Sequence, residues 1–273
     1  KNKKPTLLLI LLLCLAMLSA CADSTTGSAA VDPADTISVT QTSGSVTVPA
    51  VSVKYDSDDY SFDWKSQNYQ TIDLSGGSKT ISRSGIYEIT GTLSDGSLAV
   101  EVDRDTDNGT VFLILNNTSI SSTTGAPVYI REAEKVVVIL ESGTSNTLYQ
   151  GSDCVVDADN EPSAALFSKS DLTITGSGTL NVITDFNDGI TSKDTLKITD
   201  GTLSIKAAGD GIVGKDLLAV EKANITVTAG KDGLRATNDT ESGMGSILLT
   251  DGVYVINSAN DAIQAYGVLQ IDG

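Results

Sequence analysis

The sequence lacks histidine, and aromatic residues make up only 5 % of its 273 residues. Zinc is normally held by His and clustered Cys, so the absence of His, with only three Cys, argues against a zinc site. A close-packed globular enzyme usually has more aromatic side chains in its core. Positive charge is also scarce, because the net charge is −17. Nucleic acids and anionic lipid surfaces are therefore poor partners, and an acidic ligand would need a bridging cation.

The cysteines point to secretion rather than to a disulfide framework. An apolar run at residues 7–18 follows three lysines and is too short to span a bilayer comfortably. The run leads into LSAC, the pattern of a bacterial lipobox, which predicts a lipoprotein signal peptide at residues 1–20 and lipidation of Cys21 on the bacterial cell surface. The alternative is an ordinary secretory signal cut nearby. Cys154 is then left without a partner, and we expect it to be a small buried residue.

The mature chain divides by composition into three parts. Residues 21–50 are rich in Ser and Thr and predict a flexible tether. Residues 51–72 predict an N-terminal cap of the kind that repeat proteins need over their open first layer. The interleaved aromatic and acidic residues at 55–69 leave a ligand-binding patch as the alternative. Residues 73–273 form the repeat domain, which stops in the middle of a repeat, so we expect the chain to be C-terminally truncated.

Short strands, and almost no helix, are expected from residue 73 onward. Apolar and polar residues alternate in short segments bounded by Gly or Asp-Gly, a pattern typical of strands. Examples of such segments are residues 86–89, 111–115, 136–140 and 172–174.

An acidic turn recurs at a fixed interval. Asp188, Asp210 and Asp232 are separated by 22 residues each, and Asp261 follows after 29. The apolar positions that keep the same step are Ile190, Ile212, Leu234 and Ile263. Such a period indicates a solenoid. The motifs of leucine-rich repeats and of calcium-binding nonapeptide rolls are absent, so the pattern predicts an all-β, single-stranded parallel β-helix with about 22 residues and three strands per coil.

Stacked coils would place the carboxylates of these turns within about 5 Å of one another. Like charges at that distance raise each other's pKa or require a counter-ion. Asp194 and Asp216 form a second acidic ladder one short strand away. Calcium takes six to eight oxygen ligands in irregular geometry, so it is the cofactor that these ladders suggest. The alternative is ordinary turn chemistry, because Asp side chains commonly cap their own turns.

Two lysines lie beside these acids in the repeat. Lys193 or Lys215 could remove the proton next to a uronate carboxylate while calcium neutralises that carboxylate, as in a lyase. The alternative is charge pairing with Asp194 and Asp216, and it is the interpretation that we favour.

Three segments, residues 84–93, 141–148 and above all 164–180 with FSKSDLTITGSGTL followed by NDGITSKD, carry a family resemblance. They resemble the bacterial cell-surface carbohydrate-binding β-helix family, which is related in fold to calcium-dependent pectate lyases. The resemblance covers roughly residues 60–273. It implies a right-handed parallel β-helix, bound calcium, and binding of plant cell-wall polysaccharide, either cellulose or polygalacturonate.

The resemblance gives the calcium role to Asp188, Asp210, Asp232 and Asp261, and more weakly to Asp194 and Asp216. One coil earlier, Ala164 takes the position of Asp188, so the column should begin at Asp188. Few aromatic side chains are available to stack on single sugars, namely Trp64, Tyr149, Phe186 and Tyr266.

Three functions therefore remain open at the level of sequence. The first is a non-catalytic surface lipoprotein that binds polyuronate or cellulose through calcium. The second is a calcium-dependent pectate lyase with a Lys base. The third is a structural adhesin or stalk, because fold does not dictate function.

Overall fold

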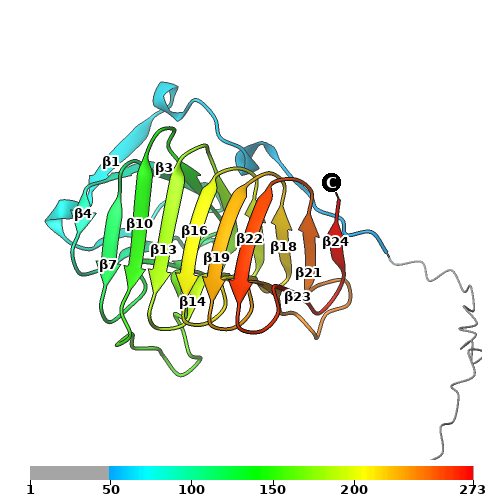
Figure 1. The fold of residues 1–273 in the computed structure, drawn as a ribbon. Coiled ribbons are helices and arrows are strands. Elements are labelled where there is room, and N and C mark those ends of the chain that lie inside the picture. Colours follow the sequence, from blue (N-terminus) through cyan, green and yellow to red (C-terminus); the bar gives the residue numbers. More distant parts are fainter. Residues whose placement is uncertain (1–48, 273) are drawn as a thin grey trace, which may run out of the picture. The chain divides into compact units, whose positions relative to one another are not determined.

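The computed structural model describes residues 49–272, which wind into a parallel β-helix (Figure 1). The predicted signal peptide at residues 1–20, the lipidation site Cys21 and nearly all of the predicted tether at 21–50 lie outside the described residues. Within the described part, no helix is long and apolar enough to cross a membrane.

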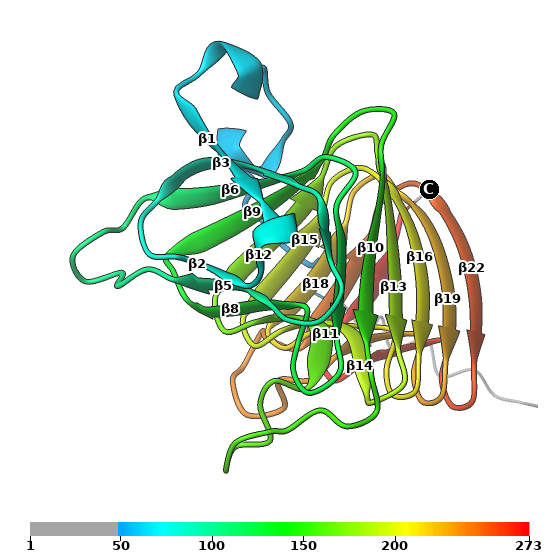
Figure 2. The same ribbon diagram turned by 90° about the vertical axis from the view of Figure 1, so that its left-hand side faces the viewer.

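Three parallel sheets run along the β-helix, one on each of its sides (Figure 2). The nine-stranded sheet contains β1 (Tyr69–Asp73), β3 (Gly85–Thr90), β6 (Thr110–Leu115), β9 (Lys135–Leu140), β12 (Asp171–Thr175), β15 (Thr195–Ile198), β18 (Leu217–Val220), β21 (Ser246–Leu249) and β24 (Leu269–Ile271). The seven-stranded sheet contains β4 (Thr92–Leu93), β7 (Ser119–Ser122), β10 (Ser145–Gln150), β13 (Thr179–Thr184), β16 (Thr202–Ala207), β19 (Asn224–Ala229) and β22 (Val253–Ser258). The eight-stranded sheet contains β2 (Lys79–Ile81), β5 (Leu98–Glu101), β8 (Val128–Glu132), β11 (Ala164–Ser168), β14 (Asp188–Ser192), β17 (Ile212–Gly214), β20 (Leu234–Ala236) and β23 (Ile263–Ala265).

Each coil consists of three strands, as the sequence predicts. The predicted segments 86–89, 111–115, 136–140 and 172–174 lie in β3, β6, β9 and β12. The smallest sheet has seven strands, so the described residues make seven complete coils. The 22-residue step holds where Ile190 pairs with Ile212 and Ile212 with Leu234. It does not hold everywhere, since Val136 pairs with Leu172 across 36 residues because residues 151–163 form a long insertion.

The interior of the coils is filled by stacked aliphatic side chains. The predicted ladder is confirmed, because Ile190, Ile212 and Leu234 are fully buried and in register, with Ile263 partly buried at the end. Like residues stack because each side chain packs against the equivalent one in the next coil, about 4.8 Å away.

Helical structure within residues 49–272 is limited to three short 3₁₀ turns, which confirms the expectation of almost no helix. They are η1 (Ser57–Asp59), η2 (Trp64–Ser66) and η3 (Leu74–Gly76).

Of the predicted cap at residues 51–72, the last residues belong to β1, which forms the end of the nine-stranded sheet by pairing with β3. Residues 51–66, which we name the strap, do not lie over the end of the first coil. They run along the outer face of the nine-stranded sheet (Figures 1 and 2), and the backbone N–H of Val51 donates to Gln270 on β24. Further along, the Tyr60 hydroxyl donates to Glu221. The physical reason is that this sheet face carries apolar side chains that need cover. Within that cover, Trp64 packs with the residues Ile114, Val137 and Ile139.

Candidate functional site

The predicted aspartate column is present on the eight-stranded sheet. The backbone N–H of Asp210 donates to Asp188 Oδ1 at 2.9 Å, and the N–H of Asp232 donates to Asp210 Oδ1 at 2.9 Å. The N–H of Asp261 completes the series on Asp232 Oδ1 at 3.0 Å. Asp188, Asp210 and Asp232 are buried, whereas Asp261 is exposed. Ala164 is in register with Asp188, so the column begins at Asp188 as the sequence predicts. The carboxylates of Asp188, Asp210 and Asp232 therefore each tie one coil to the next.

A guanidinium that the sequence pattern did not single out pairs with two of the carboxylates in this column. Arg235 on β20 places Nη1 2.8 Å from Asp210 Oδ2 and Nε 3.5 Å from Asp232 Oδ2. Asp188 has no ion-pair partner of this kind among the described residues. Burial raises the pKa of Asp188 to about 6, although the N–H from Asp210 opposes the shift. The column thus has its own internal cation at two of its four positions.

The aspartate column does not fit a calcium ion. Calcium needs six to eight oxygen ligands, but one oxygen of each buried carboxylate already accepts a backbone N–H. Arg235 also hydrogen-bonds the second oxygen of Asp210, and its Nε lies within ion-pair distance of the second oxygen of Asp232. Across residues 49–272, no group of three or more acidic or Cys side chains is arranged to hold a metal ion. The feature of the sequence that argues against calcium at the aspartate column is Arg235, which lies three residues after Asp232.

The second acidic ladder has a different environment. Asp216 accepts a hydrogen bond from Asn238 Nδ2 at 2.6 Å. Burial and the negative charges of Asp171 and Asp216 raise the pKa of Asp194. Two half-buried carboxylates of adjacent coils therefore repel each other here without a guanidinium between them. Their oxygen chemistry suits calcium, and calcium at Asp194 and Asp216 stays a prediction.

The two lysines beside the acids are engaged in ion pairs. Lys215 Nζ lies 3.7 Å from Asp216 Oδ1, which confirms one of the two pairings that the sequence favoured. Lys193 instead pairs with Glu161 at 3.1 Å, because the insertion at 151–163 folds this buried acid over the sheet. Glu161 also binds Lys169 at 2.9 Å. Although burial opposes it, these two lysines hold the pKa of Glu161 below its usual value.

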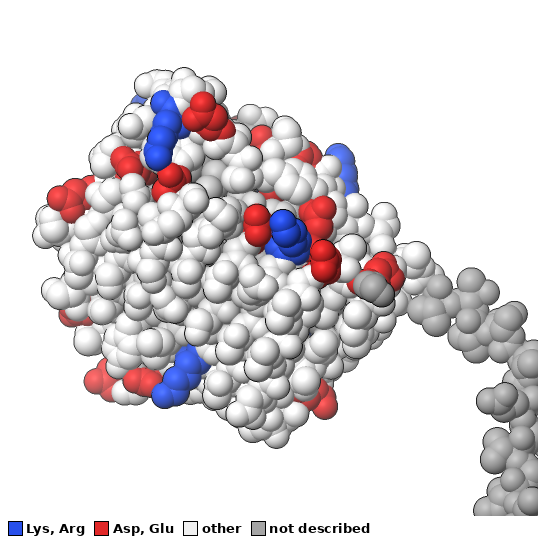
Figure 3. Space-filling model, turned by 45° about the horizontal axis from the view of Figure 1, so that its top comes forward, with Lys and Arg blue, Asp and Glu red and all other residues white. Residues whose placement is uncertain are grey.

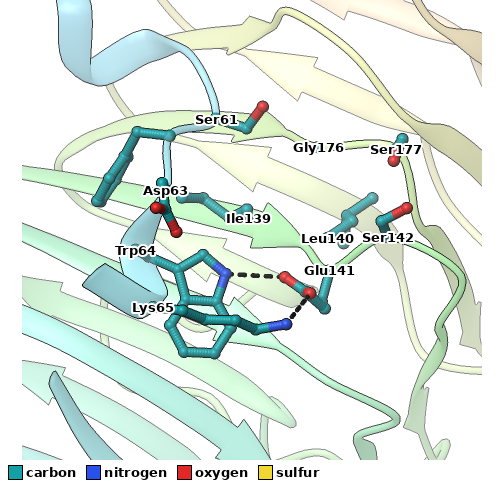
Figure 4. Close-up of a pocket in the computed structure, with 11 residues that line it drawn as sticks. Ser61, Asp63, Trp64, Lys65, Ile139, Leu140, Glu141, Ser142, Gly176 and Ser177 are labelled. Atoms are coloured by element: carbon teal, nitrogen blue, oxygen red, sulfur yellow. Dashed lines mark hydrogen bonds and ion pairs between the residues drawn. The ribbon is translucent and has the colours of Figure 1, made fainter. Parts of the chain in front are cut away.

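A shallow pocket of about 290 Å³ lies beside the strap (Figure 4). At its wall, Trp64 Nε1 and Lys65 Nζ each donate to Glu141 at 2.8 Å. Trp64 is only 4 % exposed, and its ring meets Tyr69 edge-on. The indole therefore holds the strap on the sheet, and its face is not open to a sugar. This removes Trp64 from the aromatic residues considered for stacking.

The outer face of the seven-stranded sheet is open along its length. The residues of β16 and β19 alternate between exposed and buried, and no described segment packs over them (Figure 1). The outward residues form three rows in register. These rows are Ser145-Thr179-Thr202-Asn224-Val253, Thr147-Asn181-Ser204-Thr226-Val255 and Tyr149-Ile183-Lys206-Thr228-Asn257. We name this set the hydroxyl face.

The hydroxyl face is almost free of charge in a protein of net charge −17. Lys206 is the one charged residue within the three rows. In Figure 3, charged side chains lie mostly near the margins of a broad uncharged area. Most of the row residues carry hydroxyl or amide groups, which both donate and accept hydrogen bonds. Segments such as TLSIKA and NITVTA alternate polar and apolar residues, so the sequence predicted that one face of each strand would carry polar side chains. The alternation alone does not predict which of the three sheets stays uncovered.

Among the aromatic residues named for stacking, Tyr149 is the one that lies on the hydroxyl face. Its ring is half-buried beside Ile183, and its hydroxyl donates to Asp185 at 2.8 Å. Phe186 is half-buried in the turn that precedes β14, and Tyr266 is exposed just after β23. The face therefore offers an apolar step at Tyr149 and Ile183, two exposed valines on β22 (Val253 and Val255), and hydrogen-bonding groups between them.

Comparison with known proteins agrees with a carbohydrate-related fold. Residues 75–273 match the model of a family described as carbohydrate-binding domain-containing protein. A carbohydrate-binding domain-containing protein of Acetivibrio thermocellus is 37 % identical over 132 residues, which are 46 % of this chain and 44 % of that protein. The match thus spans less than half the length of this relative.

A solved structure gives a similar result for the fold. The polysaccharide lyase-like protein from C. thermocellum, determined as a gadolinium derivative, superposes with a TM-score of 0.66 at 27 % identity. The superposition covers 74 % of this chain and 96 % of that one. The strap lies before the first residue of the family match.

Proposed function

Because the chain belongs to the family of carbohydrate-binding domain-containing proteins, we propose that it binds plant cell-wall polysaccharide on the hydroxyl face and does not cleave it. The observation that carries this proposal is the open, nearly uncharged sheet face with rows of hydroxyl and amide groups. A polysaccharide presents many hydroxyl groups to such a surface, so each row can exchange hydrogen bonds with it in place of water.

The alternative is a lyase, which the likeness to a polysaccharide lyase-like protein favours. A Lys general base must reach the proton that it removes and must first lose its own. Lys193 is bound to the buried Glu161, and Lys215 lies against Asp216. Both ammonium groups are therefore engaged by carboxylates of the protein, which supports binding over cleavage.

Placing a charge in the middle of the hydroxyl face tests the proposal. We expect Thr226→Glu to weaken retention in gels containing polysaccharide by at least about tenfold, since an unpaired charge set against a neutral ligand costs more than ~1.4 kcal/mol. Thr226 is exposed, so the variant should fold normally. The measurement is affinity electrophoresis in gels containing soluble cellulose derivatives or polygalacturonate.

Val155→Glu is the matched control, because Val155 is 71 % exposed on the insertion at 151–163, away from this face. Equal retention of wild type and both variants would contradict the placement on the hydroxyl face. The same mixtures should show no rise in ultraviolet absorbance from unsaturated uronate. A rise that disappears in Lys193→Ala or Lys215→Ala would establish the lyase instead.

Calcium belongs to the proposal only at the second acidic ladder. We expect calorimetric titration to show uptake of Ca²⁺ by wild type and its loss in Asp194→Asn, because that change removes one of two adjacent carboxylates. Asp261→Asn is the control, since Asp261 is exposed at the end of the other column. Absence of heat in the wild-type titration would remove calcium from the proposal. The lipid anchor at Cys21 stays a prediction from sequence.

A further inference from the structure

We propose that the hydroxyl face binds a single extended, neutral glycan chain that crosses the strands, with about one sugar ring on each coil. This inference rests on the proposed function and adds the direction of the ligand, its register and its charge. The claim concerns soluble, separated chains rather than a crystalline glycan surface, because the face has only one aromatic side chain, Tyr149.

The spacing of the rows sets the register. The side chains of Asn181, Ser204 and Thr226 lie in register on three adjacent parallel strands. Neighbouring strands are separated by about 4.8 Å. That repeat is close to the length of one ring in an extended chain of equatorially linked pyranoses. A chain that follows this row therefore meets a hydroxyl or amide group at each ring from β10 to β19, and it reaches the exposed Val255 on β22.

The dimensions of the face set the direction. Strands β16 and β19 each have six residues, of which alternate ones point outward, so a chain that followed a strand would soon run past the sheet edge. The rows cross five strands, from β10 to β22. A polymer therefore makes more contacts along the rows than along a strand. Because a regular backbone ladder links the coils, the row side chains are held in place before binding, which lowers the entropy cost of binding.

The charge of the face sets the ligand class. Thr202, Ser204 and Thr226 carry no charge, and Lys206 is the one cation in the three rows. A polyuronate would bring one carboxylate per ring to a protein of net charge −17, and this long-range repulsion opposes its approach. A neutral glycan meets no such penalty. Charge complementarity therefore favours neutral chains on this face.

Tyr149 lies in the neighbouring row, Tyr149-Ile183-Lys206-Thr228-Asn257, and marks the β10 end of the hydroxyl face. With Ile183 in register next to it, the phenol ring forms the apolar step of the face. Its hydroxyl is held by Asp185, which fixes the ring in place. One sugar can place its apolar face on this step, while the other rings are bound by hydroxyl and amide groups. The two ends of the bound chain therefore differ, because the β10 end offers an aromatic ring and the β22 end offers the aliphatic side chains of Val253 and Val255.

The test is a length series of neutral cello-oligosaccharides, from disaccharide to hexasaccharide, titrated calorimetrically into the full chain. We expect the affinity to rise with each added ring and to level off near the pentasaccharide. Galacturonate oligomers of the same length, which differ in linkage geometry as well as in charge, should bind at least about tenfold more weakly. Ser204→Glu should abolish the length dependence, while the control Val155→Glu should keep it. Both positions are exposed, and circular dichroism will show whether each variant is folded.

The outcomes separate this inference from the proposed function. If wild type is retained by polysaccharide gels and Thr226→Glu is not, but oligomer affinity is independent of length or higher for galacturonate, the register and the ligand class are wrong while the binding face stands. If no gel retains the wild type, the proposed function fails as well. Self-association in sedimentation, abolished by Ser204→Glu and accompanied by no sugar binding, would assign the face to a second copy of the chain and overturn the inference.

Discussion

The Asp59→Ala variant is expected to lose about 3 to 5 kcal/mol of unfolding free energy, the loss typical when one partner of a buried ion pair is removed. Asp59 is fully buried in the strap, and its carboxylate binds Lys135 at 2.8 Å and Lys197 at 2.9 Å. Thr173 Oγ1 donates to the same carboxylate at 2.6 Å. Removing it leaves two lysines, whose side chains are only 13 % exposed, without their shared counter-ion.

The pH dependence of protein stability provides an independent test of the ion pairs made by Asp59. Burial alone would raise its pKa, but the hydrogen bonds from Lys135, Thr173 and Lys197 outweigh this and lower the pKa to about 2. A carboxyl with a depressed folded-state pKa stabilises the protein fully above its unfolded value, near 4, and loses that contribution as the pH falls toward 2. Wild type should therefore lose stability over this range more steeply than Asp59→Ala.

Urea unfolding of wild type and variant at neutral pH provides the measurement. Asp63→Ala is the matched control, because Asp63 lies in the same strap, is exposed, and makes no side-chain capping bond at the start of η2. We expect this control to stay within about 0.5 kcal/mol of wild type. An Asp59→Ala midpoint equal to that of the control would mean that the strap does not hold the sheet through this ion pair.

The Asp188→Asn variant is expected to be more stable than wild type at pH 7 to 8, by about 2 to 3 kcal/mol. Burial raises the pKa of Asp188 from 3.8 to about 6, and a tenfold change in proton affinity corresponds to about 1.4 kcal/mol of free energy. Asparagine keeps an oxygen to accept the N–H of Asp210, now 2.9 Å from Asp188 Oδ1, and it carries no buried charge. The change therefore removes the cost of the buried charge and keeps the bond that joins the coils.

The sign of the pH dependence follows from the raised pKa. Between pH 4 and 6 the folded protein binds a proton on Asp188 that the unfolded chain has released, so wild-type stability falls as the pH rises through this window. Asp188→Asn should lack this fall and should match wild type near pH 4. Melting temperatures measured from pH 4 to 8 test this, with Asp261→Asn as the exposed control on the same column. A variant less stable than wild type at pH 8 would show that the ionised carboxylate is stabilising.

Much of the fold followed from periodicity. The 22-residue recurrence of Ile190, Ile212 and Leu234 predicts that these side chains stack, and they are in register and fully buried. The alignment of Ala164 with Asp188 was also predicted correctly. Such positions are readable because a solenoid converts sequence spacing directly into spatial neighbours. The confirmed pairing of Lys215 with Asp216 is equally local, since the two residues are adjacent in sequence.

The partners of the charged groups were less accessible from the sequence. Lys193 was expected to pair with Asp194 but binds Glu161, because a non-repeating insertion folds back over the coils. The calcium interpretation of Asp210 and Asp232 did not anticipate Arg235 between them. A guanidinium on a long side chain can reach across coils, so its contacts depend on the side-chain conformation and on local burial rather than on spacing alone.

By itself, the sequence determined the winding of this protein: three strands per coil, stacked aliphatic interiors and columns of equivalent turns, because a regular repeat leaves the backbone ladder few other ways to pair. Only the tertiary structure decided which sides of the β-helix are covered and which is open. Asp59 is buried against Lys135 and Lys197, so the strap lies on the nine-stranded sheet and leaves the rows around Ser204 and Thr226 exposed. That choice depends on contacts between non-repeating residues and the coils, which no period in the sequence encodes.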